Sequence, residues 1–175
     1  MAFYTASSGT TSYTGTADDD YFRFDTEFDA QNFDIGTTVD GGGGTDKVTF
    51  SFRSSYAATT ITVDLDAGFS VDGVTYVTFT GVENVDLLNT PSTQSYTLNG
   101  TSGANTLAGD SGNDTINGLG GNDILSGGEG TNVLNGGAGN DRLNGSYYTA
   151  ATTMNGGTGD DTYSILVAGS DTVVE

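Results

Sequence analysis

Aspartate and asparagine side chains recur at a fixed interval in the second half of the chain, and they are the residues that could do chemistry. One such residue stands at every ninth position from Asn105 to Asp141, and Asp161 follows twenty residues later. The chain of 175 residues contains no cysteine and no histidine. This excludes thiolate and imidazole metal sites and Ser-His-Asp catalysis, and it leaves carboxylate and carbonyl oxygens, which suit Ca²⁺ or Mg²⁺.

The charge balance agrees with a chain that holds cations. There are 23 acidic residues against four basic ones (Arg23, Lys47, Arg53 and Arg142), which gives a net charge of −19, and the hydrophobic fraction is 34%. Such a composition is typical of chains that do not fold unaided, although 10% aromatic residues and a single proline argue against a disordered tail. We therefore expect stabilisation from outside the chain. Nucleic acid is not an expected partner, because a chain this acidic repels phosphate.

Each of the recurring Asp and Asn residues occupies the sixth position of a nine-residue unit, with glycine at positions one and four and an apolar residue at position eight. The units are GTSGANTLA (100–108), GDSGNDTIN (109–117), GLGGNDILS (118–126), GGEGTNVLN (127–135), GGAGNDRLN (136–144) and GGTGDDTYS (156–164). A period of nine is not helical, and six turn-forming residues before a polar-apolar-polar triplet predict a tight loop and a very short strand. A flexible glycine-rich linker, the competing interpretation, would not keep an aliphatic residue in phase.

Stacking these units predicts a β-solenoid with two units per coil. Alternate apolar residues then fall in opposite sheets, with Leu107, Leu125, Leu143 and Tyr163 in one and Leu98, Ile116, Leu134 and Met154 in the other. The eleven-residue interval GSYYTAATTMN (145–155) lacks the loop glycines and the acid. It is predicted to be a looped-out half coil with Tyr147 and Tyr148 near its tip.

The first ninety residues are less regular. They contain a partial unit, GTADDDYFR (15–23), with Asp18 in place of a glycine, and a complete one, GGGGTDKVT (41–49). Alternating β-branched and aromatic residues predict strands within 59–68 and 74–88. We expect residues 1–90 to form an irregular β-rich N-terminal cap on the open end of the roll, and residues 91–175 to form the roll with a C-terminal cap. The boundary is placed in the segment around Pro91.

The units resemble the hemolysin-type GGxGxDxUx nonapeptides of RTX (repeats-in-toxin) proteins. The resemblance implies an all-β fold, a right-handed parallel β-roll that folds on calcium. It also implies export by a type I system to the extracellular space or cell surface, which agrees with an N-terminus that lacks a secretory signal. No apolar run is long enough to span a membrane. Relatives continue beyond such a final unit, so we expect the chain to be part of a larger secreted protein.

The resemblance also implies the ligand sets. In the family each calcium ion lies between two loops one coil apart. From the first loop it binds the carbonyl oxygens of positions two and four and the side chain of position six. From the next loop it binds the carbonyl oxygens of positions one and three and the side chain of position six. One edge then has three sites: Thr101, Gly103 and Asn105 with Gly118, Gly120 and Asp123; Leu119, Gly121 and Asp123 with Gly136, Ala138 and Asp141; and Gly137, Gly139 and Asp141 with Gly156, Thr158 and Asp161. The opposite edge has one site, formed by Asp110, Gly112 and Asp114 with Gly127, Glu129 and Asn132.

About four calcium ions are therefore expected, since calcium binds six to eight such oxygens. The third site requires the eleven-residue interval to keep the loops in phase. Asn105 and Asn132 are neutral, so their sites should bind more weakly. Asp46 and Asp20 are further candidates without an identified stacking partner.

The expected function is that of a structural and secretion scaffold that folds on extracellular calcium. The alternative is a calcium-dependent carbohydrate- or surface-binding module of the adhesin kind. Tyr21, Phe22, Phe24, Phe28 and Phe33 could form a sugar-stacking platform, although packing inside the cap is the favoured interpretation.

Catalysis is not expected, because without histidine or cysteine it would depend on carboxylates or calcium. Asp64 and Asp66 could suggest a glycosidase pair, but they are interpreted as part of a solvated face. Glu83 and Asp86 are expected to cap or tie a turn, with calcium binding as the alternative.

Overall fold

The computed structural model describes residues 2–5, 12–26, 36–52, 60–146, 150–165 and 171–174. These residues form strands, turns and loops without a helix. The strands are β1 (Phe3–Thr5), β2 (Ser12–Thr14), β3 (Tyr21–Thr26), β4 (Thr37–Asp40), β5 (Lys47–Phe52), β6 (Ile61–Asp64), β7 (Gly68–Val71), β8 (Val74–Thr80), β9 (Asn84–Leu88), β10 (Tyr96–Asn99), β11 (Thr106–Ala108), β12 (Thr115–Gly120), β13 (Ile124–Ser126), β14 (Val133–Ala138), β15 (Arg142–Asn144), β16 (Thr153–Thr158), β17 (Thr162–Ser164) and β18 (Thr172–Val174).

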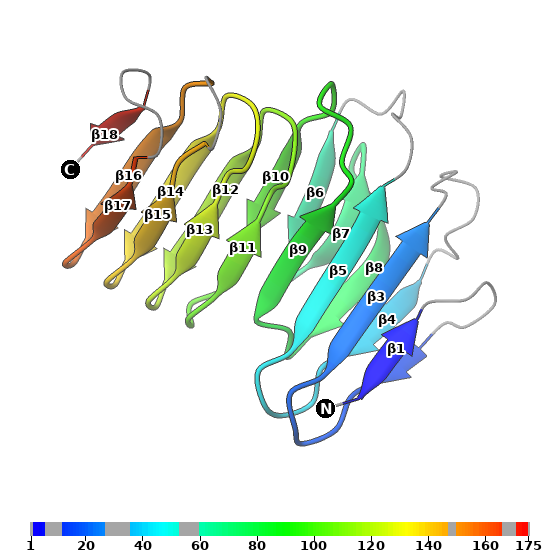
Figure 1. Cartoon of the computed structure of the whole chain (residues 1–175). Coiled ribbons are helices and arrows are strands. Elements are labelled where there is room, and N and C mark those ends of the chain that lie inside the picture. The colour runs from blue at the N-terminus through cyan, green and yellow to red at the C-terminus, as the bar shows by residue number, and fades with distance from the viewer. Residues whose placement is uncertain are drawn as a thin grey trace.

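The described strands form two sheets that run the length of the molecule (Figure 1). One sheet has the order β1-β3-β5-β9-β11-β13-β15-β17, and every neighbouring pair in it is parallel. The other has the order β18-β16-β14-β12-β10-β6-β7-β8-β4-β2 and is parallel except around β7. Because consecutive strands alternate between the sheets except for β6, β7 and β8, the chain winds as a β-roll with its termini at opposite ends (Figure 1), which confirms the predicted fold class.

The apolar residue at position eight of each unit fills the interior of the roll. Leu107, Leu125, Leu143 and Tyr163 are paired in one sheet, and Leu98, Ile116, Leu134 and Met154 in the other. All of these side chains are buried except that of Tyr163, which is half-buried. The predicted alternation is therefore confirmed. The strands continue in register past the eleven-residue interval, since Gly137 pairs with Gly157.

The strands before residue 90 belong to the same two sheets. An inserted hairpin interrupts the winding: β7 runs antiparallel between β6 and β8. The turn between β7 and β8 is Asp72-Gly73, with positive φ at both residues, as two-residue hairpins require. The division at about residue 90 remains a prediction, and no break in the sheets marks it.

In the eight-stranded sheet, β3 and β5 have six residues each, against three in the repeat strands β11, β13, β15 and β17. β3 and β5 each place two apolar side chains inward, and Phe24 stacks on Phe50 with ring centroids 5.0 Å apart. Phe50 in turn stacks on Phe69 at 4.8 Å. Phe22 is also buried, whereas Tyr21 is half-buried with Lys47 Nζ 6.0 Å from its ring. Packing of Phe22 and Phe24 agrees with the favoured interpretation, and Phe28 and Phe33 lie outside the described residues.

Asp64 ends β6 and caps the turn that follows it. Its carboxylate accepts hydrogen bonds from the backbone N–H groups of Asp66 (3.0 Å) and Ala67 (2.9 Å) and from Asn99 Nδ2 (2.9 Å). Tyr147 and Tyr148, at the tip of the predicted looped-out half coil, lie outside the described residues. In the described part of the chain, no helix has the length and apolar character needed to cross a membrane.

Candidate metal centres

The loops of the roll stack in two rows, one along each edge of the sheets. The first edge, as we call it, is made of segments 15–20, 41–46, 81–83, 100–105, 118–123, 136–141 and 156–161, which connect the ten-stranded sheet to the eight-stranded one. The second edge includes segments 109–114 and 127–132, which connect the sheets in the other direction. Each predicted ligand set joins two loops that are neighbours in one of these rows.

A ladder of hydrogen bonds links the position-six residues of the first edge. Asp123 Oδ1 accepts from the N–H of Asn105 at 2.7 Å, Asp141 Oδ1 from that of Asp123 at 2.8 Å, and Asp161 Oδ1 from that of Asp141 at 2.8 Å. Each carboxylate thus has one oxygen bound to the coil before it. This contact fixes the carboxylate and leaves its second oxygen for another partner.

The second oxygens of Asp123 and Asp141 have no hydrogen-bond partner in the described structure, although both side chains are buried. The same holds for the second oxygens of Asp46, Asp114 and Asp171. A buried carboxylate oxygen without a partner is costly, and native proteins seldom keep one unless a ligand, water or ion supplies the contact. Four of these five aspartates are residues at which the sequence predicts metal ions, and the fifth is Asp171; the predicted ligand Asp161 is not among them.

The glycine at position one of each loop faces the same space as these oxygens. A Cβ placed on Gly118 would overlap Asp123 Oδ2 and lie 2.6 Å from the carbonyl oxygen of Gly136, in the next coil. A Cβ on Gly136 would likewise overlap Asp141 Oδ2 and lie 2.6 Å from Gly156 O. A carboxylate oxygen and a carbonyl oxygen from the next coil therefore converge in front of each glycine, a donor set that suits a hard cation such as Ca²⁺.

Positions two and four adopt the left-handed conformation, which turns their carbonyl groups along the stack. Leu119 has φ 75° and Gly121 has φ 95°. A Cβ on Gly137 would collide with the carbonyl oxygen of Leu119, and a Cβ on Gly139 with that of Gly121. Leu119 is 54% exposed, so no burial compensates for this conformation, which is unfavourable for a branched residue. The loop geometry directs the backbone carbonyls toward the next coil.

The structure therefore brings together the second and third predicted ligand sets of the first edge. The condition on the third set is met, because Gly157 and Thr158 pair in register with Gly137 and Ala138. A hard cation in these sets would be held by two carboxylates and by backbone carbonyls. Among the described residues, no group of three or more Asp, Glu, His or Cys side chains could hold a metal by side chains alone.

The first predicted set differs because its lower loop is closed by its own hydrogen bonds. Neither Thr101 nor Gly103 adopts the left-handed conformation. Asn105 Oδ1 accepts from the N–H of Thr101 at 2.7 Å, and Asn105 Nδ2 donates to the Glu83 carbonyl oxygen at 2.7 Å. The neutral amide thus uses both of its polar atoms within the protein, which agrees with the expectation of a weaker site.

The predicted set on the second edge is also brought together. Asp110 and Gly112 have φ of 68° and 121°, and a Cβ on Gly109 would lie 2.5 Å from Asp114 Oδ2 and 3.0 Å from Gly127 O. Asn132 Oδ1 accepts from the N–H of Asp114 at 2.8 Å, while its Nδ2 faces the Glu129 and Gly130 carbonyls of its own loop at 3.4 and 3.2 Å.

Burial raises the pKa of four of the carboxyl groups that keep an unpartnered oxygen. For Asp114, burial raises the pKa to about 8 against the hydrogen bond from Tyr96 N–H, with a smaller contribution from the charge of Asp110. For Asp123, burial raises the pKa to about 6 against the hydrogen bond from Asn105 N–H. Burial also raises the pKa values of Asp141 and Asp46. Without a cation the folded chain therefore disfavours the charged forms of these groups.

Asp20 shows the opposite behaviour. Burial would raise its pKa, but hydrogen bonds from the backbone N–H groups of Ala2 and Thr16 outweigh burial and lower it. Both carboxylate oxygens of Asp20 therefore have protein donors, whereas one oxygen of Asp46 has none. Of the two further candidates, Asp46 has the environment of the repeat aspartates.

Sequence reasoning missed Asp171. Its Oδ1 accepts from the N–H of Thr152 at 2.9 Å and its Oδ2 is buried without a partner, so it holds a position-six place on the second edge. The signal was present, since GSDTV (169–173) repeats the Gly-x-Asp-x-apolar part of the unit. A second ladder was also missed: at position five, Asn122 Oδ1 accepts from Asn140 N–H, and Asn140 Oδ1 accepts from Asp160 N–H.

Comparison with known proteins agrees with this geometry. The family model of the RTX calcium-binding nonapeptide repeat matches residues 99–134 and 126–146, with four copies. No curated protein matches the chain. The matched residues contain the loops around Asp123 and Asp114, where unpartnered carboxylate oxygens face the carbonyls of the next coil.

Proposed function

We propose, because residues 99–134 and 126–146 match the RTX calcium-binding nonapeptide repeat, that the chain is a structural module that folds when calcium binds between its stacked loops. The observation that carries the proposal is the pair of buried, unpartnered oxygens on Asp123 and Asp141, each opposite a carbonyl group of the next coil. Calcium would supply the missing contacts and neutralise the carboxylates, while the chain's own residues hold those oxygens in place through the hydrogen-bond ladder.

The dependence on calcium follows from linkage. An ion that binds the folded chain and not the unfolded one stabilises the fold by about 2.7 kcal/mol when its concentration is 100 times its dissociation constant. Several ions bound at once add several such contributions. The repeat carboxylates with raised pKa values oppose folding in the absence of calcium and support it when calcium is present.

We assign about four ions to the predicted sets, in a definite order of affinity. The sets that share Asp141 have two carboxylates each and should bind most tightly. The set of Asp114 has one carboxylate and the neutral Asn132, and the set that begins at Thr101 has the closed amide of Asn105. Calcium affinity follows ligand charge and the rigidity of the site, so these two sets should bind more weakly.

The experiment is circular dichroism of the full chain in EGTA and then in rising calcium. We expect a largely unfolded spectrum in EGTA and a β spectrum in millimolar calcium. A β spectrum that is already complete in EGTA would refute folding on calcium.

The proposed setting is outside a bacterial cell, as one part of a larger protein exported by a type I system. RTX repeats occur typically in secreted proteins, and the low calcium concentration of the cytoplasm would keep the module unfolded for export. We propose a scaffold role without catalysis of its own. Secretion of the chain's natural parent protein from cells with and without a type I exporter tests the export route, and equal secretion from both would contradict it.

A second candidate, binding to a neutral glycan or surface, is favoured by the outer face of the ten-stranded sheet. Asparagines stand in register there, and Nδ2 of Asn117 and of Asn135 each donate to the Oδ1 of the preceding asparagine at 2.8 Å. The two outward columns contain no charged residue from β10 to β16: they are Thr97, Thr115, Val133 and Thr153, and Asn99, Asn117, Asn135 and Asn155.

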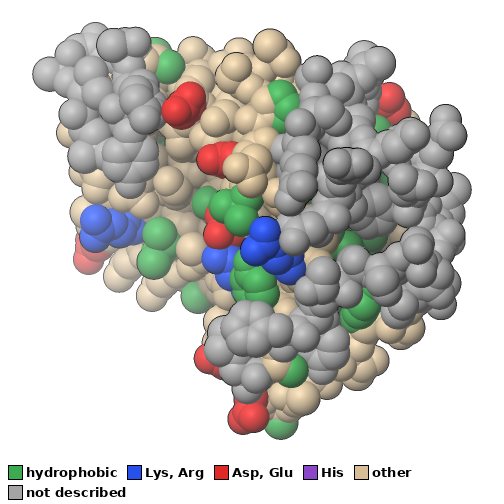
Figure 2. Space-filling view, turned by 45° about the vertical axis from the view of Figure 1, so that its right-hand side comes forward, with side chains coloured by type: hydrophobic (Ala, Val, Ile, Leu, Met, Phe, Trp, Pro, Cys, Tyr) green, Lys and Arg blue, Asp and Glu red, His purple; other side chains and the backbone are tan. Residues whose placement is uncertain are grey.

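The outer face of the eight-stranded sheet carries both positive and negative side chains and is therefore less suited to binding a polyanion. It carries Lys47, whose Nζ lies 2.7 Å from Asp86 Oδ2, and basic side chains lie beside acidic ones on the face shown in Figure 2. A glycan array with and without calcium, probed with the wild type and an Asn117→Lys variant, tests the second candidate. Binding that requires calcium and is lost in the variant supports it, and no binding to any glycan removes it.

A further inference from the structure

The loop 41–46 lies outside the matched repeats but has their backbone conformation. Gly42 and Gly44 have φ of 91° and 112°, as at positions two and four of the repeat loops. The side chain of Asp46 is 1% exposed, and its Oδ2 has no hydrogen-bond partner among the described residues. The loop therefore provides the ligands on one side of a cation site, and the next coil has to provide those on the other side.

The next coil meets this loop with a turn of three residues, Gly81 to Glu83, instead of six. The N–H of Gly41 donates to Thr80 O at 2.8 Å, which places Gly81 beside Gly41. A Cβ on Gly41 would lie 2.5 Å from Asp46 Oδ2 and would overlap the carbonyl oxygen of Gly81, so these two oxygens face one space. This is the arrangement found in front of Gly118 and Gly136.

Glu83 takes the place that an aspartate holds in the repeats. Its Oε2 accepts from the N–H of Asp46 at 2.7 Å, as Asp141 Oδ1 accepts from the N–H of Asp123. The extra methylene of glutamate spans the distance that the shorter turn leaves. One carboxylate oxygen of Glu83 is fixed by this hydrogen bond, which holds the carboxylate beside the backbone of Asp46.

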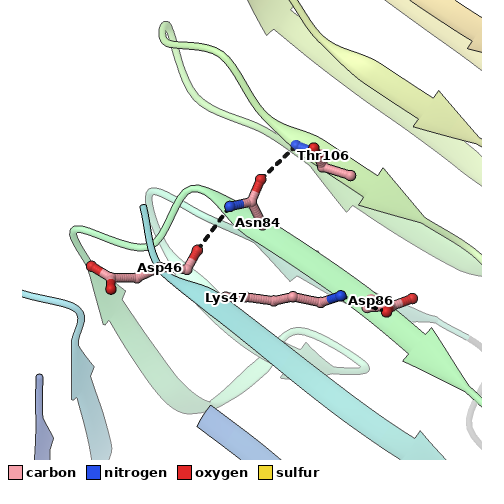
Figure 3. A network of polar contacts seen from close by, with 5 residues as sticks. All are labelled: Asp46, Lys47, Asn84, Asp86 and Thr106. Carbon is pink, nitrogen blue, oxygen red and sulfur yellow. Dashed lines mark hydrogen bonds and ion pairs between the residues drawn. The ribbon is translucent and has the colours of Figure 1, made fainter. Parts of the chain in front are cut away.

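The surroundings of Asp46 are acidic. Burial raises its pKa, the hydrogen bond to the N–H of Asp20 opposes this, and the charges of Glu83, Asp20 and Asp19 raise the pKa further. Lys47, the next residue, points along the sheet to Asp86 (Figure 3). Figure 3 also shows the Asp46 carboxylate directed away from Asn84, whose Nδ2 donates to the backbone carbonyl oxygen of Asp46. A cation would offset this concentration of negative charge.

We propose that Asp46 and Glu83, with the carbonyl oxygens of Gly42 and Gly81, form a further calcium site closed by a glutamate on a three-residue turn. A Cβ on Gly81 would lie 3.3 Å from Gly42 O, so this carbonyl also faces the next coil. Water completes the six to eight oxygens that calcium binds. The site extends the proposed function, on which it rests, to the N-terminal coils, because it joins the strands β4 and β5 to β8 and β9.

Isothermal titration calorimetry of the full chain with calcium tests the site, using Glu83→Gln and Asp46→Asn. Both variants keep an oxygen that can accept the ladder hydrogen bond, and Asn132 shows that an amide at position six accepts it. We expect each variant to bind one ion fewer than the wild type, and the double variant to lose the same single ion. Asp66→Asn, in the turn after β6, removes one charge from an exposed residue and should leave the number unchanged.

Each outcome bears on one claim. If the wild type binds calcium and the Glu83→Gln and Asp46→Asn variants bind the same number of ions as the wild type, this site alone is overturned. A double variant that loses two ions would also overturn it, because the two side chains would then hold separate ions. A wild type that binds no calcium would instead contradict the proposed function. Circular dichroism in calcium verifies that the variants are folded.

Discussion

Replacing Asp123 by asparagine should change the stability of the fold in opposite directions with and without calcium. The side chain is 1% exposed, and its folded-state pKa of about 6 lies above the ordinary value of 3.8. The metal-free fold therefore holds a proton that the unfolded chain releases, and its stability falls as pH rises from about 4 to about 6. At pH 7 this cost is fully present and amounts to about 3 kcal/mol, at 1.36 kcal/mol per pKa unit.

Asparagine removes this cost because it carries no charge, and its Oδ1 can still accept the N–H of Asn105, as Asp123 does at 2.7 Å. In EGTA the variant should therefore fold more readily than the wild type, by up to about 3 kcal/mol. In calcium the variant should be less stable, since Asp123 belongs to two predicted ligand sets. A hundredfold loss of affinity at each corresponds to about 2.7 kcal/mol per site, so the two losses together outweigh the gain of about 3 kcal/mol from removing the charge.

Two folding titrations followed by circular dichroism at pH 7 measure these effects. The first uses trimethylamine N-oxide in EGTA, because this osmolyte favours folded states without binding them. The second uses calcium. We expect the osmolyte midpoint of Asp123→Asn to fall and its calcium midpoint to rise, with no change for Asp66→Asn. A shift of both midpoints in the same direction would refute the assignment of Asp123 as a buried metal ligand.

Three further predictions follow from the same geometry. In EGTA, acidification from pH 8 to 5 should stabilise the fold, because the pKa values of Asp114 and Asp123 in the folded chain, about 8 and about 6, lie above 3.8; a melting temperature that falls on acidification would contradict this. Replacing Asn84 by alanine in calcium should cost about 0.5–1.5 kcal/mol in urea unfolding, because it removes the acceptor of a solvent-exposed backbone N–H group at 2.8 Å; an unchanged midpoint would show that the contact is dispensable. Gly137→Ala should lower both the calcium affinity and the free energy of unfolding, because its Cβ would meet the Leu119 carbonyl oxygen. Gly73→Ala, also at positive φ but with open space around it, should cost only about 1–2 kcal/mol of stability and leave calcium affinity unchanged. Equal effects of the two variants on calcium affinity would show that the carbonyl stacking is irrelevant.

The repeat half of the fold could be predicted from sequence because its geometry is strictly local. A period of nine fixes the register, so Leu98, Ile116 and Leu134 had to align once two units made a coil. The placement of Asp123 beside Asp141 followed from the same count. Nothing outside the nonapeptide was needed to derive these contacts.

The remainder depended on contacts that spacing does not encode. Glu83 stands 37 residues after Asp46 because the β6–β8 hairpin is inserted between them, so no period connects the two residues that the structure pairs at 2.7 Å. The hydrogen bonds that close the Asn105 loop depend on the orientation of the Asn105 side-chain amide. The position of the Glu83 carbonyl oxygen, which accepts from Asn105 Nδ2, sets this orientation, and spacing does not predict that position.

The contacts at the junction between the N-terminal coils and the repeats also depend on the fold and could not be predicted from spacing. Asn84 Nδ2 donates to Asp46 O at 3.1 Å, and Asn84 Oδ1 accepts from the N–H of Thr106 at 2.8 Å (Figure 3). These side-chain contacts bridge a three-residue turn and a six-residue loop whose backbones do not match. Sequence spacing identified neither partner.

Anomalous diffraction from crystals of the chain grown in calcium tests the central claim most directly, because it locates the ions without reference to folding or function. We predict a calcium peak between the loops 118–123 and 136–141, in contact with Asp123 Oδ2 and the Gly136 carbonyl oxygen. An anomalous map without a peak at that position, in crystals whose other sites are filled, would contradict the account.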